Sequence, residues 1–231
     1  MFIYNHGGVL LILLVYVDDI LLTGNSVQQL MSLLAYLNKA FALKDLGPLN
    51  YFFGIEAKRH GSSLHLSQSK YAHDLLIQTK MQHANPISSP IVPCKQLSIR
   101  DGDPMSDPTL YRSTVGALQY LTLTRPDIQF AVNKACQFMH SPTLLHWQAV
   151  KRILRYLRGT IHDGLTIHGS SNCGLIAYSD ADWASNPDDR KSTSGYCIFM
   201  GPNLILWCAQ KQSHCSFKHG IGISCNCSCF G

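Results

Sequence analysis

The sequence VLLILLVYVDDILLTGN, residues 9–25, joins a nine-residue apolar run, two adjacent carboxylates and a second, shorter apolar run. This pattern predicts a strand, a tight turn and a returning strand, and Thr23, Gly24 and Asn25 end the hairpin. We expect the first strand to be buried, with Asp18 and Asp19 at its end. Nine apolar residues are far fewer than the roughly 20 that a membrane span requires, and no charged residue precedes them as in a signal peptide.

Two carboxylates at the end of an apolar strand form the most informative chemical feature. Burying acidic groups costs several kcal/mol unless a cation or hydrogen bonds offset the cost. A pair of divalent metal ions, about 4 Å apart, would do so and is the device of nucleotidyl transfer. Adjacent strand residues point to opposite faces, so Asp18 and Asp19 can share metals only at the bend, with Asp18 as the direct ligand. The alternative is an ordinary turn, where aspartates are common.

Helical and strand periodicities alternate along the rest of the first hundred residues. Ser26 is placed to cap a helix that would cover the strands, with apolar residues at helical spacing at positions 30, 33, 34, 37 and 41. A second hairpin is expected at residues 51–66, turning at His60 and Gly61, and a helix should run from Ser67 to about residue 80. Five prolines between residues 85 and 108 indicate a linker, which places a boundary near residue 100.

Beyond the linker the pattern predicts helices at about 110–122, 126–139 and 143–158, separated by Arg125-Pro126 and Ser141-Pro142. Short strands are expected from residue 165 onward. The clearest of these are 175–178 and 196–200.

Positive charge is concentrated in residues 111–158, where seven basic residues stand against Asp127 alone, although the whole chain carries a net charge of only +5. The third predicted helix places Lys151, Arg155 and Arg158 on one face, opposite an apolar face formed by Val150, Ile153, Leu154 and Leu157. Such a face fits a phosphate backbone. A solvated helix surface is the alternative.

The nine cysteines are odd in number, and five of them lack metal-like or paired spacing. They are typical of reduced, mostly buried thiols in an intracellular protein, so we expect no disulfide partner. Neither the cysteines nor the apolar run requires a membrane or secreted protein. The sequence does not distinguish among cytoplasm, nucleus and organelle.

Seven motifs, in order and without a large gap, resemble the reverse transcriptases of copia-type (Ty1/copia) retrotransposon Pol polyproteins. They are VYVDDILLTG (15–24), LKDLG (43–47), YFFGI (51–55), LSQSKY (66–71), YRSTVGALQYL (111–121), TRPDI (124–128) and RILRYLRGT (152–160). The resemblance runs from about residue 9 to residue 212. Within it, YSDADW (178–183) and RKSTSGY (190–196) look like the first two strands of the ribonuclease H domain that follows in this family.

The resemblance implies an α+β fold: a partial palm hairpin, a helical thumb and connection, and a truncated ribonuclease H-like strand region. The implied boundaries are 1–66 for the palm, 67–100 for a thumb helix and linker, 101–164 for the thumb and connection, 165–212 for the ribonuclease H start and 213–231 for a divergent tail. The implied reaction is RNA-directed DNA synthesis with two Mg²⁺ ions, and the implied partners are an RNA/DNA template-primer and dNTPs.

The resemblance also implies roles for individual residues. Asp18 and Asp19 would be catalytic metal ligands of the polymerase, and Asp180 would be the first metal ligand of the ribonuclease H site, with Asp182 a weaker candidate. An aspartate at the end of a strand is otherwise commonly a turn residue. Residues of the third predicted helix would lie along the template-primer backbone, making contacts that are independent of base sequence. These are Lys151, Arg152, Arg155 and Arg158.

Both implied metal sites lack ligands within these 231 residues. Polymerase chemistry in the family takes a further aspartate upstream of the hairpin, yet no acidic residue precedes Asp18. Ribonuclease H takes three or four carboxylates, yet no acidic residue follows Asp189. We therefore expect a reverse transcriptase fragment that is inactive as an isolated chain. The alternatives are a non-enzymatic template-primer binding module and an inert relic.

The tail from Ser213 departs from the family, and a frameshift is our hypothesis for it. Genomic DNA tests this, because an alternative frame encoding the expected Ser-Ser-Thr-Glu helix start would support the frameshift. The competing hypothesis is a zinc site, although Cys-x-Cys-x-Cys lacks the spacing of common zinc knuckles. Its candidate ligands are His214, Cys215, His219, Cys225, Cys227 and Cys229.

Overall fold

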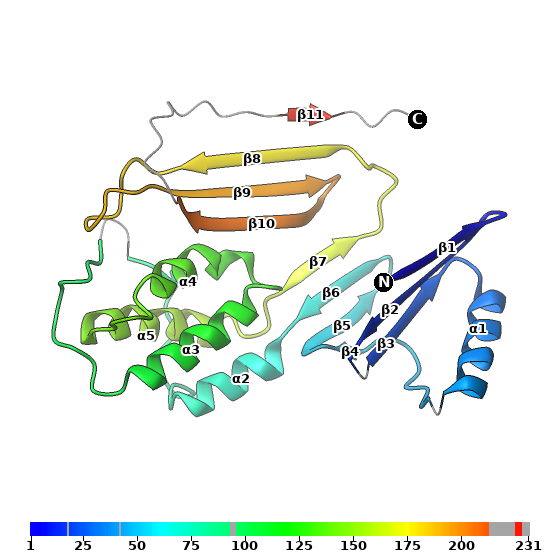
Figure 1. Cartoon of the computed structure of the whole chain (residues 1–231), viewed down its shortest axis with the longest axis horizontal. Coiled ribbons are helices and arrows are strands. Elements are labelled where there is room, and N and C mark those ends of the chain that lie inside the picture. Colours follow the sequence, from blue (N-terminus) through cyan, green and yellow to red (C-terminus); the bar gives the residue numbers. More distant parts are fainter. Residues whose placement is uncertain (18, 42, 93–95, 213–224, 228–231) are drawn as a thin grey trace. The chain divides into compact units, whose positions relative to one another are not determined.

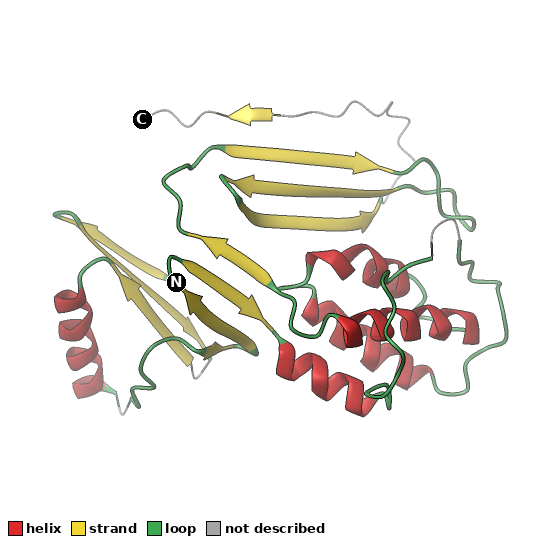
Figure 2. Ribbon diagram, turned by 180° about the vertical axis from the view of Figure 1, so that it is seen from behind, coloured by secondary structure: helices red, strands yellow, loops and turns green. Residues whose placement is uncertain are grey.

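The computed structural model describes residues 1–17, 19–41, 43–92, 96–212 and 225–227, and the chain forms two compact units. The first unit is Met1–Ala57 and the second is Lys58–Gly231. Both combine helices with antiparallel strands, which Figures 1 and 2 show from opposite sides. The prediction of a mixed α+β chain is therefore confirmed, whereas the finer domain boundaries stay predictions.

Three antiparallel strands in the order β1-β2-β3 form the sheet of the first unit. They are β1 (Phe2–His6), β2 (Val9–Tyr16) and β3 (Asp19–Gly24). The predicted hairpin is β2 and β3, in which Leu14 pairs with Leu21 and Tyr16 with Asp19. Strand β1 was not predicted, because its five residues alternate weakly and include Asn5 and His6.

One side chain closes the open end of this hairpin. The Oδ1 atom of Asn25 accepts a hydrogen bond from the Leu10 N–H at 2.9 Å, and its Nδ2 atom donates to the Gly8 carbonyl at 2.9 Å. The Asn25 N–H also donates to the Leu10 carbonyl at 3.1 Å. Just before it, Gly24 lies so close to the backbone of Leu10 and Leu11 that a Cβ atom would not fit. The Thr-Gly-Asn end of the motif thus has a structural role.

Helix α1 (Val27–Ala40) follows, and Ser26 caps it as predicted by accepting a hydrogen bond from the Gln29 N–H at 3.4 Å. No residue of α1 is buried, and Leu11 and Ala57 are the buried hydrophobic residues among those described in this unit. The prediction that β2 is a buried strand is therefore wrong. A single 14-residue helix is too little material to cover both faces of a three-stranded sheet.

Two short strands, β4 (Tyr51–Phe52) and β5 (Ile55–His60), make the next hairpin, and β5 continues from the first unit into the second. In the second unit β6 (Ser63–Ser67) pairs with β7 (Leu165–His168) in antiparallel register. The turn at His60 and Gly61 lies where the sequence predicted it.

Four α-helices form the body of the second unit: α2 (Ser69–Gln78), α3 (Pro108–Leu121), α4 (Gln129–Cys136) and α5 (Leu144–Gly159). A short 3₁₀ helix, η1 (Pro126–Ile128), leads into α4. Asp107 caps α3 through hydrogen bonds from the N–H groups of Thr109 and Leu110, and Pro108 occupies the first helical position, where no donor is needed. All three helices predicted beyond the linker are present within a few residues of the expected bounds.

The hydrophobic core lies where these helices meet. The predicted apolar face of α5 is fully buried, since Val150, Ile153, Leu154 and Leu157 are each at most 2% exposed. It packs with residues of α2, α3 and α4, among them Leu76, Leu118 and Val132. This single core, and not the sheet of the first unit, holds most of the buried apolar surface of the described chain.

The remaining strands form a sheet in the order β10-β9-β8-β11. These are β8 (Leu175–Ala181), β9 (Thr193–Met200), β10 (Asn203–Lys211) and β11 (Cys225–Cys227). Strand β10 lies over α4, as Figure 1 shows, and the indole N–H of Trp207 donates to the Thr122 carbonyl at 3.1 Å. The sheet is thereby tied to the helices of its own unit.

A buried histidine joins the start of α5 to the preceding linker. Thr143 and His146 form a capping box, in which the His146 Nδ1 atom accepts a hydrogen bond from the Thr143 N–H at 3.0 Å. The Nε2 atom lies 3.1 Å from the Ser98 carbonyl oxygen, and the ring stacks on the Phe138 ring with 3.9 Å between the ring centroids. Both ring nitrogens are thus satisfied in the neutral form that carries its proton on Nε2.

We expect protonation of His146 to destabilise the second unit. Burial lowers the pKa of His146 below 6.5, although the Ser98 carbonyl and the carboxylates of Asp101 and Asp188 oppose the shift. Between the folded and unfolded pKa values the unfolded chain binds more protons, so stability rises with pH there and is lost as pH falls below 6.5. Urea unfolding across this range measures the loss.

The matched variants are His146→Gln and His140→Gln, the second at an exposed position. His146→Gln should flatten the pH dependence below 6.5, whereas His140→Gln should leave it unchanged. An identical slope in wild type and His146→Gln would contradict the assignment. The lowered pKa values of Asp127, Asp188 and Asp189 change the stability in a separate range, below pH 3.8.

Candidate active site and nucleic-acid interface

The acidic pair of the sequence motif lies at the turn between β2 and β3. Strand β2 ends at Tyr16 and β3 begins at Asp19, so the turn consists of two residues, of which Asp18 is outside the described residues. Val17 has φ = 50° and is 80% exposed. Positive φ is unfavourable for a β-branched residue, so Val17 is a strained position next to the candidate ligands.

The environment of this turn differs from the one we expected. Asp19 is exposed. Tyr16, which pairs with Asp19 across the two strands, is 48% exposed. The Tyr16 ring packs edge-on against the Phe53 ring, with 4.3 Å between the ring centroids. Because β2 is not a buried strand, Asp19 incurs no burial cost for a cation to offset. The electrostatic reason given for a metal at this position is therefore wrong for Asp19.

The donor groups that the structure describes do not make a complete metal centre. Among the described residues, no three His, Cys, Asp or Glu side chains come together as metal ligands would. Asp19 is accessible as one donor at the turn, but two neighbouring carboxylates supply fewer ligands than a metal pair needs. These residues alone do not fit the Mg²⁺ pair that the resemblance implies.

Asp180, the candidate of the second site, lies near the end of β8 opposite Gly195 of β9. Its side chain is exposed, and its Oδ1 atom accepts a hydrogen bond from the N–H of Ala181 at 2.8 Å. It has the position of a strand-end carboxylate that is open to solvent. The structure leaves its role as a metal ligand a prediction.

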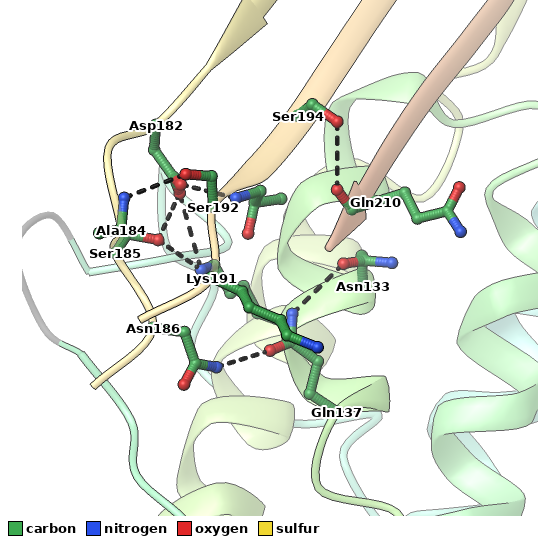
Figure 3. A network of polar contacts seen from close by, with 12 residues as sticks. Asn133, Gln137, Asp182, Ala184, Ser185, Asn186, Lys191, Ser192, Ser194 and Gln210 are labelled. Carbon is green, nitrogen blue, oxygen red and sulfur yellow. Dashed lines mark hydrogen bonds and ion pairs between the residues drawn. The ribbon is translucent and has the colours of Figure 1, made fainter. Parts of the chain in front are cut away.

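Asp182, the weaker candidate, takes part in structural hydrogen bonds, and its role as a metal ligand stays a prediction. Its Oδ1 atom accepts a hydrogen bond from the Thr193 N–H at 2.6 Å, and its Oδ2 atom accepts one from the Ser185 hydroxyl and lies 3.9 Å from Lys134 Nζ. Burial lowers the pKa of Lys134, an effect that Asp182 opposes. Figure 3 shows Asp182 within a network of polar contacts, where it fastens the β8–β9 connection.

The same network ties this connection to helix α4. Asn186 donates from Nδ2 to the Oε1 atom of Gln137 at 3.1 Å, and the Ala184 N–H donates to the Ser192 hydroxyl at 3.0 Å (Figure 3). The motifs around residues 178–196 thus include residues with a clear structural role. Sequence reasoning missed it because the partners on α4 lie about 50 residues away.

The four basic candidates on α5 do not all project freely. The Nε atom of Arg155 donates to the Asn85 carbonyl at 2.7 Å, and that of Arg158 donates to the Gln82 carbonyl at 2.8 Å. Lys151 is exposed and its Nζ atom lies 5.9 Å from the Trp147 ring centroid, while Arg152 is half-buried. Two arginines therefore also fix the segment after α2, and their remaining N–H groups are the ones left to contact phosphates.

Two further arginines that we counted in the positive segment serve internal contacts. Arg112 donates to the carbonyls of Met139 and His140, and Arg125 is only 3% exposed. Arg125 makes a bidentate ion pair with Asp127 at 2.9 and 2.7 Å. The outward positive field is thus smaller than the sequence count, because these charges are used inside the fold.

The cysteines and the tail complete the candidates from the sequence. Cys136, Cys197 and Cys208 are half-buried and Cys173 is exposed, and all four are free thiols, so the expectation of mostly buried thiols is wrong for the described ones. Burial raises the pKa of Cys136 to about 11, which keeps it protonated. The frameshift and zinc hypotheses concern residues 213–231, which lie outside the described residues except for the backbone of β11.

Within the described ranges, none of the helices combines the length and the apolar character that a membrane span requires.

Comparisons with known proteins identify the family. The family model described as "Reverse transcriptase (RNA-dependent DNA polymerase)" matches residues 1–93. The chain is 49% identical over 212 residues, 92% of its length, to the retrovirus-related Pol polyprotein from transposon RE1 of Arabidopsis thaliana. It is 39% identical over 213 residues, 87% of its length, to that from transposon TNT 1-94 of Nicotiana tabacum. No solved structure matches significantly.

The extent of these matches differs between relatives. The chain spans only 14% of the RE1 polyprotein and 16% of the TNT 1-94 polyprotein. It is also 50% identical over 200 residues to an uncharacterized mitochondrial protein of Arabidopsis thaliana, of which it covers 83%. Nearly all of this chain therefore aligns within a short stretch of the polyproteins, and the chain belongs to the family of copia-type retrotransposon Pol polyproteins, in their reverse transcriptase region.

Proposed function

We propose that this chain carries part of an RNA-directed DNA polymerase and is inactive as an isolated polypeptide. One observation carries the proposal: the Tyr-Val-Asp-Asp motif runs from the end of β2 to the start of β3, where an antiparallel hairpin turns, inside the residues that match the reverse transcriptase family. Asp19, the first residue of β3, is exposed at this end of the hairpin.

The assignment of parts follows the order of elements. Strands β2 and β3 with helix α1 would belong to the palm, and β5 and β6 to the hairpin that grips the primer terminus. Helices α2 to α5 would form the thumb and connection, and β8 to β10 the start of a ribonuclease H domain. The template-primer and dNTPs would be the ligands of the complete enzyme.

The proposed inactivity rests on the incomplete ligand set. Metal ions hold the attacking and leaving oxygens in nucleotidyl transfer, and carboxylates from several strands must fix them. Among the described residues, Asp19 is the acidic residue at the hairpin end, and no acidic residue precedes Asp18 in the sequence. The exposed, thinly packed sheet of the first unit would also leave any bound ion open to water.

A primer-extension assay tests this proposal. The purified chain is incubated with an RNA template, a labelled DNA primer, dNTPs and Mg²⁺, beside a complete reverse transcriptase as positive control and an Asp18→Ala variant as negative control. We expect no extension by the chain beyond the level of the variant. Extension by the wild type that Asp18→Ala abolishes would overturn the proposed inactivity and would support the catalytic assignment of Asp18.

A second candidate function is favoured by helix α5. Lys151 and Arg158 are exposed on this helix, and Arg152 and Arg155 lie beside them. A protein that has lost its chemistry can still bind a template-primer through such a surface, because phosphate contacts need no metal site. The remaining possibility is an inert relic, and salt-dependent binding to an RNA–DNA hybrid distinguishes the two.

A further inference from the structure

A cavity of about 640 Å³ lies within the second unit, between helices α4 and α5, the linker residues 90–92 and 96–97, and the loop 182–187. Its volume falls in the range of small-molecule sites, about 300 to 1,000 Å³. The loop forms one wall, and the polar network of Asp182 and Asn186 holds that wall in place (Figure 3). The cavity is therefore a built feature of the helical core and its surroundings.

The lining of this cavity has an apolar part and a basic part. Aromatic and aliphatic side chains from α4, α5 and their connections supply the first, including Phe130, Ala131, Phe138 and Ile153. Four cations, on α4 and α5, stand against the single carboxylate of Asp182. A ligand complementary to this lining has an apolar body and a negative charge.

The four cations are not equally available to a ligand. Lys134 donates to the Ser185 hydroxyl at 3.2 Å and faces Asp182 at 3.9 Å. The Nε atom of Arg155 donates a hydrogen bond to the Asn85 carbonyl, and Lys151 is exposed beside Trp147. These three already have partners or face solvent.

Arg152 is the exception. Its Nε–H is buried, and no acceptor among the described residues forms a hydrogen bond with it. The Arg152 side chain as a whole is half-buried and lines the cavity, so an anionic group in the cavity can pair with the part of the guanidinium that faces it. Arg152 is therefore the cation of the lining on which we place the anionic group of a ligand.

We propose that this cavity binds a small aromatic anion, with its ring system against Phe130 and Phe138 and its anionic group on Arg152. This site is separate from the hairpin turn and does not depend on the proposed polymerase ancestry. The anionic group would accept the Arg152 hydrogen bonds in a partly desolvated position, where charge-assisted hydrogen bonds are strongest.

Two fluorescent probes with the same aromatic body test the proposal. 8-Anilinonaphthalene-1-sulfonate carries one negative charge, and N-phenyl-1-naphthylamine is its neutral counterpart. Titration of the full chain should give a dissociation constant about tenfold lower for the sulfonate, because one such charged hydrogen bond contributes about 1.4 kcal/mol. Arg152→Gln should remove this preference, and Arg152→Lys should retain part of it.

Matched variants separate the cavity from other apolar surfaces. Ala149→Phe, which fills the cavity from α5, should weaken both probes, whereas Arg59→Gln, at an exposed position outside the cavity, should change neither. Thermal melting of each variant confirms that it is folded, and the Arg152→Lys comparison replaces Arg152→Gln if the latter unfolds. Equal affinities for the two probes in the wild type, or no effect of Ala149→Phe, would overturn the proposal.

Discussion

Arg125→Met should lower the free energy of unfolding of the second unit by about 3 kcal/mol, because it removes four hydrogen bonds made by a guanidinium that is only 3% exposed. Arg125 donates four hydrogen bonds: two to Asp127, one to the Thr160 carbonyl at 2.7 Å and one to the Thr160 hydroxyl at 2.6 Å. Methionine has similar length and no donor, so the acceptors lose their partners. Chemical denaturation, followed by circular dichroism, measures the loss.

The arrangement around Arg125 explains why the effect should be large. Its guanidinium joins η1 to the residue after α5, and it lies 5.8 Å from the ring centroid of Tyr156. Burial opposes ionisation of Asp127, yet the hydrogen bonds and charge of Arg125 hold the pKa of Asp127 below its usual value. The contacts of Arg125 thus connect η1 to the end of α5, two helices that are distant in sequence.

Two comparisons make the prediction specific. Arg125→Lys keeps the charge but cannot reach Asp127 and Thr160 together, so it should lose a large part of the same free energy. Arg100→Met, at an exposed position, should change stability by less than about 0.5 kcal/mol. If Arg125→Met and Arg100→Met unfold at the same denaturant concentration, the ion pair has no stabilising role.

The affinity for an RNA–DNA hybrid should fall about a hundredfold between 50 and 200 mM salt. This is the loss expected when roughly four phosphate contacts release counterions. The four contacts would come from Lys151, Arg152, Arg155 and Arg158. Because the Nε atoms of Arg155 and Arg158 already serve backbone carbonyls, their terminal N–H groups would make these contacts. Fluorescence anisotropy with a labelled hybrid measures the salt dependence.

The double variant Lys151→Gln/Arg158→Gln should roughly halve the slope of the logarithm of affinity against the logarithm of salt concentration. Lys44→Gln/Arg59→Gln removes two exposed charges outside α5 and should leave the slope nearly unchanged. Equal slopes for the two double variants would exclude α5 as the interface. An absence of binding at 50 mM salt would leave the inert relic as the remaining function.

Elements with strong local signals could be predicted from the sequence. The apolar face of α5 and the cap of α1 follow from side-chain spacing and from Ser26, and both were placed correctly. The hairpin turn between β2 and β3 follows from the break between two apolar runs. These features depend on residues within one or two helical turns, or within one hairpin, of each other.

Features that depend on distant partners could not be predicted. The exposure of β2 depends on how little of the unit covers its faces, which an apolar run does not reveal. The internal role of Arg125 depends on Thr160, and that of Arg155 on Asn85, which lies 70 residues away. A count of charges along the sequence therefore overestimated the surface available to a polyanion.

The hydrogen bonds of Asn25 have a consequence for the opposite end of its hairpin. A slip of β3 by a single residue along β2 would move every side chain of β3 to the other face, carrying Asp19 with it. Leucine and isoleucine fill five of the eight positions of β2 and three of the six of β3, and they would tolerate such a slip, since their side chains are nearly interchangeable. Asn25 sets the alignment instead, so one amide group, a full strand length away, determines on which side of the hairpin the acidic end is displayed.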